Sequence, residues 1–252
     1  MYKTKIIITD NIQRYYVYKN TMPIGFKSKR EDYSKSIIGE KTDKSLVRAL
    51  DNFVLTVEAN MTPYTKFLTL TCKDNIFDRE LFLKMFNQFT KDFKREFGYS
   101  LKYLGVLEKQ FKRKAKYNLI DGVWHIHLVV FNPKKLAFNR LKKIWGKYGS
   151  VFIEVVDNPH NIAIYSAKYL SKDNIEKNKK AILKSQNLKS PSIEYLPTAI
   201  IPSKITYHKH YMFAMTEDLD NLDPNQINEC DMYEVRLSAK HSFDTDKLNK
   251  MD

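Results

Sequence analysis

Between residues 67 and 172 the sequence alternates between two hydrophobic patterns, and their order limits the folds that the chain can adopt. Short runs rich in apolar and β-branched residues, typical of strands, lie at 67–71, 101–109, 123–131 and 151–156. Apolar residues spaced three and four apart, typical of amphipathic helices, lie at 81–97, 134–145 and 160–172. The predicted order is therefore strand, helix, strand, strand, helix, strand, helix.

This order predicts an α+β fold with a ferredoxin- or RRM-like antiparallel sheet that carries its helices on one face. A polar hairpin over 110–122 joins the two central strands. A further helix is expected over about 43–59, and a strand around 204–214. We expect an N-terminal extension and helix, a core domain, and a C-terminal strand with an acidic tail, at 1–60, 61–200 and 201–252.

The charge of the chain is concentrated in one segment. The net charge is +14, and residues 99–210 hold 21 Lys or Arg against 7 Asp or Glu, while the other 140 residues hold 22 of each. Such an excess favours a polyanionic partner. Residues 211–235 hold seven acidic residues and no basic residue, so we expect this stretch to lie away from any nucleic acid.

Several classes of protein are excluded by what the sequence lacks. Two cysteines, Cys72 and Cys230, are too few for a disulfide framework or a cysteine-built metal site. No apolar run is long enough for a signal-peptide core or a membrane span, so we expect a soluble, cytoplasmic protein that does not act at a membrane. The sequence has no G-x-x-x-x-G-K-[ST] loop, which argues against an NTP-driven motor.

The strongest local signal for chemistry is the pair His125 and His127 in an otherwise apolar strand. Residues i and i+2 of a strand project to the same face, so two imidazoles at this spacing can hold one divalent cation. Glu108, near the end of the neighbouring strand, is the candidate third ligand, and Gln110 replaces it if the register turns Glu108 away. A carboxylate beside two imidazoles suits Mg²⁺ or Mn²⁺ better than a closed zinc site. The alternatives are a chance histidine pair and a glutamate that faces solvent.

A second signal lies in the predicted helix at 160–172. Tyr165 and Tyr169 share one face because they are four residues apart, and Lys168 and Lys172 do the same. Lysines and a metal help to remove the proton of a tyrosine and to hold a phosphodiester. The alternative is an ordinary amphipathic helix whose tyrosines are buried.

Taken together, these segments resemble the HUH endonucleases, specifically the rolling-circle replication initiators of bacterial plasmids and single-stranded DNA phages. The resemblance covers about residues 42–195. It rests on FLTLT, HIHLVVF, YSAKYLSK and the later stretch SQNLKSP, at 67–71, 125–131, 165–172 and 185–191. It implies that 61–200 is the nicking and strand-transfer domain.

The resemblance also implies the reaction. His125 and His127 would bind the metal, with Glu108 as third ligand, and a tyrosine would attack single-stranded origin DNA to leave a 5′-phosphotyrosine and a free 3′-hydroxyl. Tyr169 is the first candidate for the nucleophile and Tyr165 the second. Lys168 and Lys172 would orient the phosphate or stabilise the phenolate. The expected partners are an origin hairpin, a separate helicase and the replication machinery.

Basic and aromatic residues around these motifs are candidates for DNA contacts. Lysines and an arginine of the hairpin and of the helix at 134–145 could follow backbone phosphates; they are Lys112, Arg113, Lys114, Lys116, Lys142 and Lys143. Aromatic residues between them could stack on bases; they are Tyr103, Phe111, Tyr117, Trp124 and Trp145. The alternative for each charged run is a solvated face.

Three rival functions remain open at this point. A conjugative relaxase is disfavoured because in that family the tyrosine precedes the histidine pair. Single-strand transposases usually have one tyrosine and a shorter chain. From another class, a non-catalytic single-stranded nucleic-acid-binding module on the same sheet would expose aromatic residues on its central strands, where this sequence has threonine and histidine.

Overall fold

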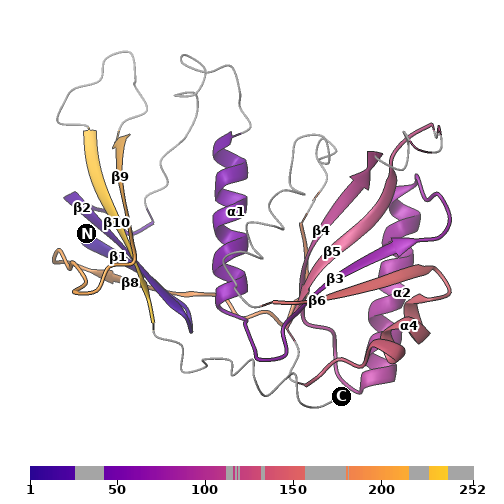
Figure 1. Ribbon diagram of the computed structural model, residues 1–252. Coiled ribbons are helices and arrows are strands. Elements are labelled where there is room, and N and C mark those ends of the chain that lie inside the picture. The colour runs from indigo at the N-terminus through magenta and orange to yellow at the C-terminus, as the bar shows by residue number, and fades with distance from the viewer. Residues whose placement is uncertain are drawn as a thin grey trace. The chain divides into compact units, whose positions relative to one another are not determined.

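The computed structural model describes residues 1–25, 43–111, 116, 118, 120–131, 134–156, 180, 182–215 and 227–237. The chain divides into two compact units (Figure 1). Unit 1 comprises Met1–Ser45 and Ser190–Asp252, and unit 2 comprises Leu46–Lys189. Each unit contains one five-stranded sheet, and unit 2 contains the residues singled out for metal binding.

The sheet of unit 2 is antiparallel at every strand pair, as the sequence predicts. Its strand order is β6-β3-β5-β4-β7, and its bounds are β3 (Lys66–Cys72), β4 (Tyr103–Gln110), β5 (Val123–Val130), β6 (Gly149–Val155) and β7 (Ile182–Lys184). The two apolar strands β3 and β5 therefore lie inside the sheet, and β6 forms one edge. The strands expected at 67–71, 101–109, 123–131 and 151–156 are confirmed within a few residues.

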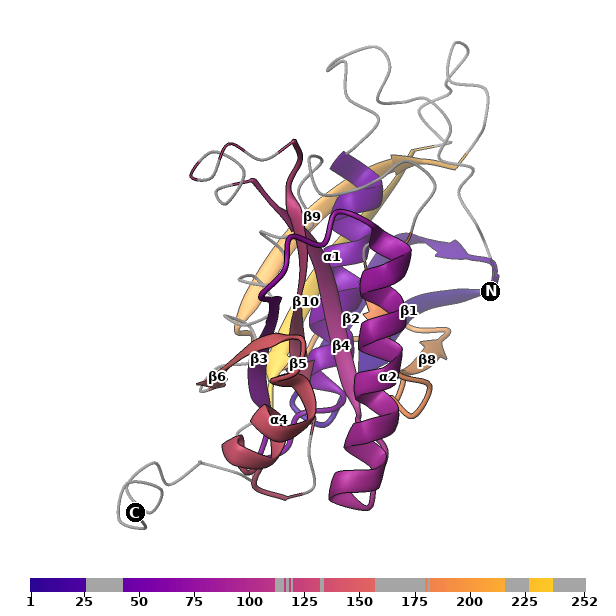
Figure 2. The same ribbon diagram turned by 90° about the vertical axis from the view of Figure 1, so that its right-hand side faces the viewer.

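One face of this sheet, called here the α2 face, is covered by two helices (Figure 2). α2 (Arg79–Phe97) buries Phe82, Phe86, Phe89 and Phe93, and α4 (Phe138–Trp145) buries Leu141, Ile144 and Trp145. They pack on alternate strand residues that include Leu68, Leu70, Ile126 and Leu128. α2 ends where the sequence predicts, because Gly98 takes the left-handed conformation, with φ 79°, that closes a helix.

The opposite face, called here the α1 face, is covered in part by α1 (Asp43–Glu58). Phe53, Val54 and Val57 of α1 pack on Phe67 and Val129 of the strands. The helix expected at 43–59 is thus confirmed, and α2 and α4 share one face as expected for the core; that α1 covers the other face was not predicted. The reason for this second cover is visible in β5, where every residue from Val123 to Val130 is buried, so both of its faces need cover.

Two tryptophans offered as base-stacking residues belong to the core instead. Trp124 is 2% exposed and Trp145 is fully buried. Their indole N–H groups donate to the backbone oxygens of Phe77 and Thr71, each at 2.9 Å. The expectation that these side chains stack on DNA is therefore wrong.

Unit 1 holds a second antiparallel sheet that the sequence reading did not foresee. Its order is β8-β1-β2-β10-β9, with β1 (Tyr2–Ile8), β2 (Ile12–Met22), β8 (Ser192–Leu196), β9 (Tyr207–Ala214) and β10 (Ile227–Arg236). The strand expected around 204–214 is confirmed as β9. The N-terminal segment forms regular strands, and β10 lies within the stretch expected to be an acidic tail; its alternate residues Asn228, Cys230, Met232 and Glu234 are buried.

Two sequence predictions for helices have other outcomes. The helix expected from about 134 starts later, at Phe138. The helix expected at 160–172 lies outside the described residues. Among the helices that are described, none is long and apolar enough to cross a membrane.

Candidate metal centre

The register of two central strands brings the three predicted ligands together. Glu108 of β4 lies directly opposite His125 of β5, and Val106 lies opposite His127. Opposed residues of antiparallel strands project to the same face, and so do residues two apart on one strand. Glu108, His125 and His127 therefore all lie on the α1 face, beyond the apolar residues that α1 covers.

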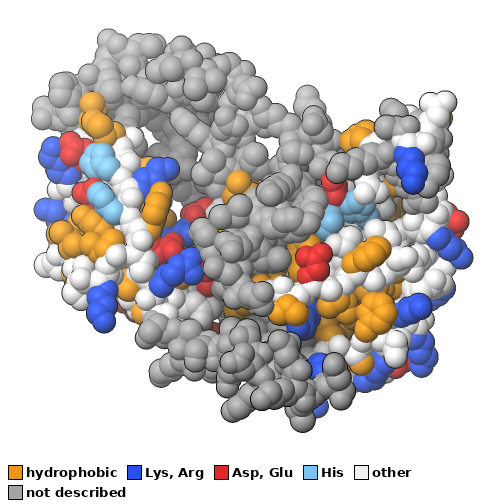
Figure 3. Space-filling view, in the orientation of Figure 1, with side chains coloured by type: hydrophobic (Ala, Val, Ile, Leu, Met, Phe, Trp, Pro, Cys, Tyr) orange, Lys and Arg blue, Asp and Glu red, His pale blue; other side chains and the backbone are white. Residues whose placement is uncertain are grey.

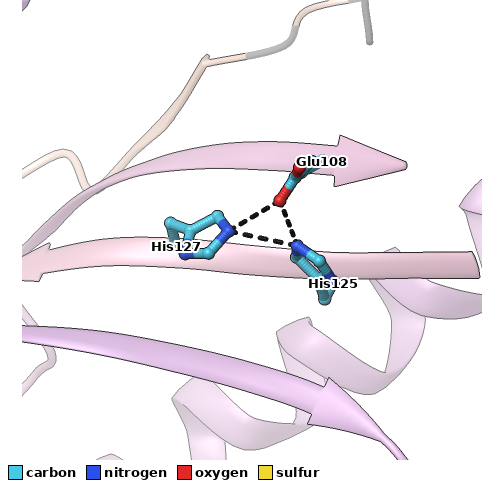
Figure 4. A group of neighbouring side chains, drawn as sticks. All are labelled: Glu108, His125 and His127. Atoms are coloured by element: carbon cyan, nitrogen blue, oxygen red, sulfur yellow. Dashed lines mark hydrogen bonds and ion pairs between the residues drawn. The ribbon is translucent and has the colours of Figure 1, made fainter. Parts of the chain in front are cut away.

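Their side chains converge on one point (Figure 4). The Glu108 Oε2 atom lies 2.8 Å from the Nε2 atom of His127 and in close contact with the Nε2 atom of His125. The two Nε2 atoms are 3.1 Å apart. Among the described residues this is the group of three metal-ligating side chains whose donor atoms all lie within 4.8 Å of one another.

The surroundings shift the pKa values of Glu108 and His127 in the directions that favour cation binding. Burial raises the pKa of Glu108, but the hydrogen bonds with His125 and His127 outweigh it and lower that pKa to about 2. Burial lowers the pKa of His127 below 6.5, although the Glu108 hydrogen bond acts in the opposite direction. At neutral pH the site therefore holds a carboxylate beside the neutral imidazole of His127.

A threonine of the neighbouring strand holds the ring of His127. Thr69 of β3 pairs with His127 in the sheet, and its Oγ1 atom lies 3.0 Å from His127 Nδ1. When Nδ1 donates its proton to this hydroxyl, the Nε2 lone pair faces Glu108. The ring also stacks on Phe67 at a centroid distance of 5.7 Å. The role of Thr69 was missed from the sequence, although its alternation in FLTLT places it on the face that faces His127.

This donor set fits a divalent cation. Two imidazole nitrogens and a carboxylate oxygen lie close together on the α1 face, and His125 and His127 are only 3% and 7% exposed. Buried polar atoms need partners, and a cation would be shared by all three.

The other predicted site residues are not brought to this point by the described structure. Tyr165, Lys168, Tyr169 and Lys172 lie outside the described residues, as do Lys112, Arg113 and Lys114. Lys116 is described and exposed.

The two lysines of α4 lie on a helix that covers the α2 face, opposite the metal group. Lys142 and Lys143 are exposed there, and the Lys143 Nζ atom lies 3.1 Å from Glu96 Oε2. This geometry therefore disfavours a direct contact between either lysine and a phosphate at the metal group.

A second histidine pair, which the sequence reading passed over, lies on β9 of unit 1. His208 Nε2 and His210 Nδ1 lie 2.9 and 3.0 Å from the same Asp231 oxygen, and these side chains are about half exposed. The i, i+2 spacing in YHKHY was the available signal. This pair has the same i, i+2 spacing as His125 and His127 but lies outside the metal group, so it offers a matched control for them.

A comparison with known protein families matches the segment that contains Glu108, His125 and His127. Residues 65–174, less than half of the chain, match the model of the family described as Replication-associated protein ORF2. The matched range contains β3 to β6 and extends across positions 165 and 169. It confirms the resemblance to rolling-circle replication initiators over these residues. Searches of curated proteins and of solved structures returned no significant match.

Proposed function

We propose that this chain, whose residues 65–174 match the ORF2 family of replication-associated proteins, is a metal-dependent endonuclease that nicks single-stranded origin DNA to initiate rolling-circle replication. The observation that carries the proposal is the convergence of Glu108, His125 and His127 on one face of the sheet. The nicking and strand-transfer domain would comprise residues 61–200.

Glu108, His125 and His127 would hold one Mg²⁺ or Mn²⁺ ion. When bound, such an ion withdraws negative charge from the scissile phosphate and so makes it easier to attack. The chain itself supplies one negative charge through Glu108 and a fixed orientation of His127 through Thr69. Because these side chains project from paired strands, they are held in place before the DNA arrives.

The nucleophile would be a tyrosine of the segment 165–172. The phenol oxygen of Tyr169 attacks the phosphorus, an O–P bond forms, and the bond from phosphorus to the 3′ oxygen breaks. The phenol proton passes to solvent, and the released 3′ oxygen takes up a proton to become the hydroxyl that primes synthesis. Tyr165 would serve the second transfer, which rejoins the strand and ends a round, and Lys168 and Lys172 would stabilise the phosphate and the phenolate.

The family match favours an initiator over a relaxase or a single-strand transposase. An initiator of this kind would act on an origin hairpin and would rely on a separate helicase and on the replication machinery, because the chain has no phosphate loop of its own.

Cleavage of labelled single strands tests the proposal. Oligonucleotides tiled across the DNA that flanks the gene are incubated with the protein and Mn²⁺. We expect cleavage at one position, which EDTA abolishes and which the double variant His125→Ala/His127→Ala lacks. The matched control is His208→Ala/His210→Ala, which removes the histidine pair of unit 1 and should leave cleavage unchanged.

Each contrary result has a definite meaning. Cleavage that persists in EDTA or in the His125/His127 variant contradicts the metal role. Binding without cleavage under Mg²⁺ and Mn²⁺ favours the non-catalytic nucleic-acid-binding module instead.

A further inference from the structure

The α1 face continues past the metal group onto β3 and the edge strand β6. Thr69 lies opposite His127 on one side and opposite Phe152 of β6 on the other. Thr71 lies opposite Ser150 in the same way. Because side chains alternate along a strand, Thr69, Thr71, Ser150 and Phe152 all project to the face that holds His125 and His127. We call these four residues the β3–β6 strip.

The strip differs in chemistry from the rest of that face. Where α1 packs, the face is apolar and buried, with Phe67 and Val129 each 1% exposed. The strip instead presents three hydroxyl groups and one phenyl ring, and Phe152 is 55% exposed. Figure 3 shows histidine side chains at the surface over the strands of unit 2, with hydrophobic side chains on the same side of the unit.

A single exposed apolar side chain is common on protein surfaces, so the exposure of Phe152 carries little by itself. Its position carries more. Adjacent strands lie about 4.8 Å apart, so Phe152 stands roughly 10 Å from His127, across Thr69. One nucleotide with its phosphate spans such a distance. An aromatic ring at this place can stack on the base of a nucleotide whose neighbouring phosphate lies at the metal group.

We propose that Phe152 is the stacking platform for a nucleobase next to the scissile phosphate, and that the hydroxyls of Thr71 and Ser150 donate hydrogen bonds to the phosphate backbone of the same single strand. This subsite rests on the proposed nicking function. Stacking accepts any base, because every base has an aromatic face, so Phe152 adds affinity and placement and does not select a sequence.

The charge at the other end of β6 determines the direction in which the single strand follows the β3–β6 strip. Glu154, two residues beyond Phe152 on the same face, is opposite Phe67 and is exposed. Its negative charge lies on the side of Phe67, away from Thr71 and Ser150. A phosphate is repelled from that side. The strand therefore follows the hydroxyl end of the strip, past Thr71 and Ser150.

Abasic scanning of the DNA tests the subsite. Affinity for a single strand with the nick position is measured in a Tyr165→Phe/Tyr169→Phe background, in which the strand stays intact. We expect Phe152→Ala to weaken binding about tenfold, whereas Phe152→Trp retains it. In the protein that keeps Phe152, removing one base beside the nick should weaken DNA binding by a similar factor. The same abasic strand should cause no further loss of affinity in Phe152→Ala, because that contact is already absent.

Two controls separate stacking from a structural role. Phe138 is 48% exposed on α4, which covers the opposite face, so Phe138→Ala should bind DNA like the wild type. The affinity for Mn²⁺ and the thermal stability should be the same in Phe152→Ala as in the wild type. A loss of DNA affinity that comes with a loss of Mn²⁺ affinity or of stability overturns the proposal.

The outcomes for the subsite and for the nicking function are distinguishable. If the wild type nicks with Mn²⁺ while Phe152→Ala keeps full affinity and the same abasic penalties, only the stacking role of Phe152 fails. If the wild type neither binds nor nicks any of the single strands, the proposed function fails, and the subsite fails with it.

Discussion

At the scale of single residues, the hydrogen bond between Thr69 and His127 decides which nitrogen of the imidazole faces Glu108. The hydroxyl lies 3.0 Å from Nδ1, so the lone pair of Nε2 is available to a cation when Nδ1 carries the proton. Thr69 is thus a positioning residue that acts through His127.

Removing this hydroxyl should weaken metal binding without removing a ligand. We expect Thr69→Val, which keeps the β-branched shape, to lower the Mn²⁺ affinity by about 10- to 100-fold. Thr69→Ser keeps the hydroxyl and should remain near the wild type. Isothermal titration with Mn²⁺ measures both, and equal affinities in the two variants would contradict the role given to Thr69.

The two cysteines should be inert in the folded protein. Cys230 is 3% exposed, and burial, followed by the charge of Asp231, raises the pKa of its thiol to about 12 from 9.0. In a Cys72→Ser variant at pH 8, we expect iodoacetamide to react with the native Cys230 about 1000-fold more slowly than with the unfolded chain.

The same shift gives a pH dependence of stability. The folded state holds the thiol proton more tightly than the unfolded state, so the free energy of unfolding should fall as the pH rises from about 9 toward 12. Rapid alkylation of the native protein, measured by mass spectrometry, would contradict both expectations.

How far the sequence determines the site can be judged residue by residue. His125 and His127 were predictable because residues two apart on a strand share a face, whereas Glu108 depended on a strand register that the sequence left open between Glu108 and Gln110. Thr69 and Phe152 were not singled out, because their importance depends on which strands flank β5 in the sheet. The burial of Trp124 and Trp145 was not predicted, because the local sequence does not tell which side of a strand or helix packs against the rest of the protein.

At the scale of elements, the attachment of β6 to β3 depends on a glycine. Gly149 lies opposite Cys72, and a Cβ atom added at Gly149 would lie 1.9 Å from the Thr71 backbone oxygen and 2.8 Å from Cys72 Cα. These are backbone atoms, so the strands themselves must move to make room.

Gly149→Ala should therefore loosen the edge of the sheet that carries Phe152. We expect it to lower the free energy of unfolding by about 1–3 kcal/mol, the usual cost of overpacking. Ser150→Ala, one residue on and exposed, should change that free energy by less than about 0.5 kcal/mol. Urea unfolding measures both, and unchanged stability of Gly149→Ala would show that β6 is not held as closely as described.

The order of elements in unit 2 was predictable because each has a clear hydrophobic period and sharp turn signals. The second sheet was not, because β1 and β2 pair with β8 and β10 from the far end of the chain. Pairing between segments that lie at opposite ends of the chain leaves no local pattern in the sequence. That helices cover both faces of the sheet was not predicted for a related reason. The spacing of apolar residues in 43–59 shows that the helix has an apolar side, but not which surface that side packs against.

At the level of the whole chain, the positive excess within residues 99–210 includes the lysines of α4 and the basic residues between β4 and β5. Lys142 and Lys143 stand on α4, over the α2 face. The basic residues between β4 and β5 begin at Lys112, four positions after Glu108 in the sequence. We therefore expect the hairpin charges to matter more for a strand at the metal group.

The salt dependence of DNA binding tests this expectation. Each phosphate contact on a single strand contributes about 0.7 to the slope of log K against log salt concentration. Changing Lys112, Arg113, Lys114 and Lys116 together to Gln should reduce the slope by about 3, whereas Lys142→Gln/Lys143→Gln should change it by less than about 1. The reverse ranking would place the DNA on the α2 face.

In the proposed reaction, a tyrosine of this chain becomes joined to DNA at a site governed by Glu108, His125 and His127. The most direct measurement is to incubate the protein with the labelled strand that it nicks and Mn²⁺, to look for a product that resists SDS, and to locate the linked residue by mass spectrometry. We expect an adduct on Tyr169 that is absent in EDTA and in the double variant Tyr165→Phe/Tyr169→Phe. An undiminished adduct in that variant would contradict the proposed reaction.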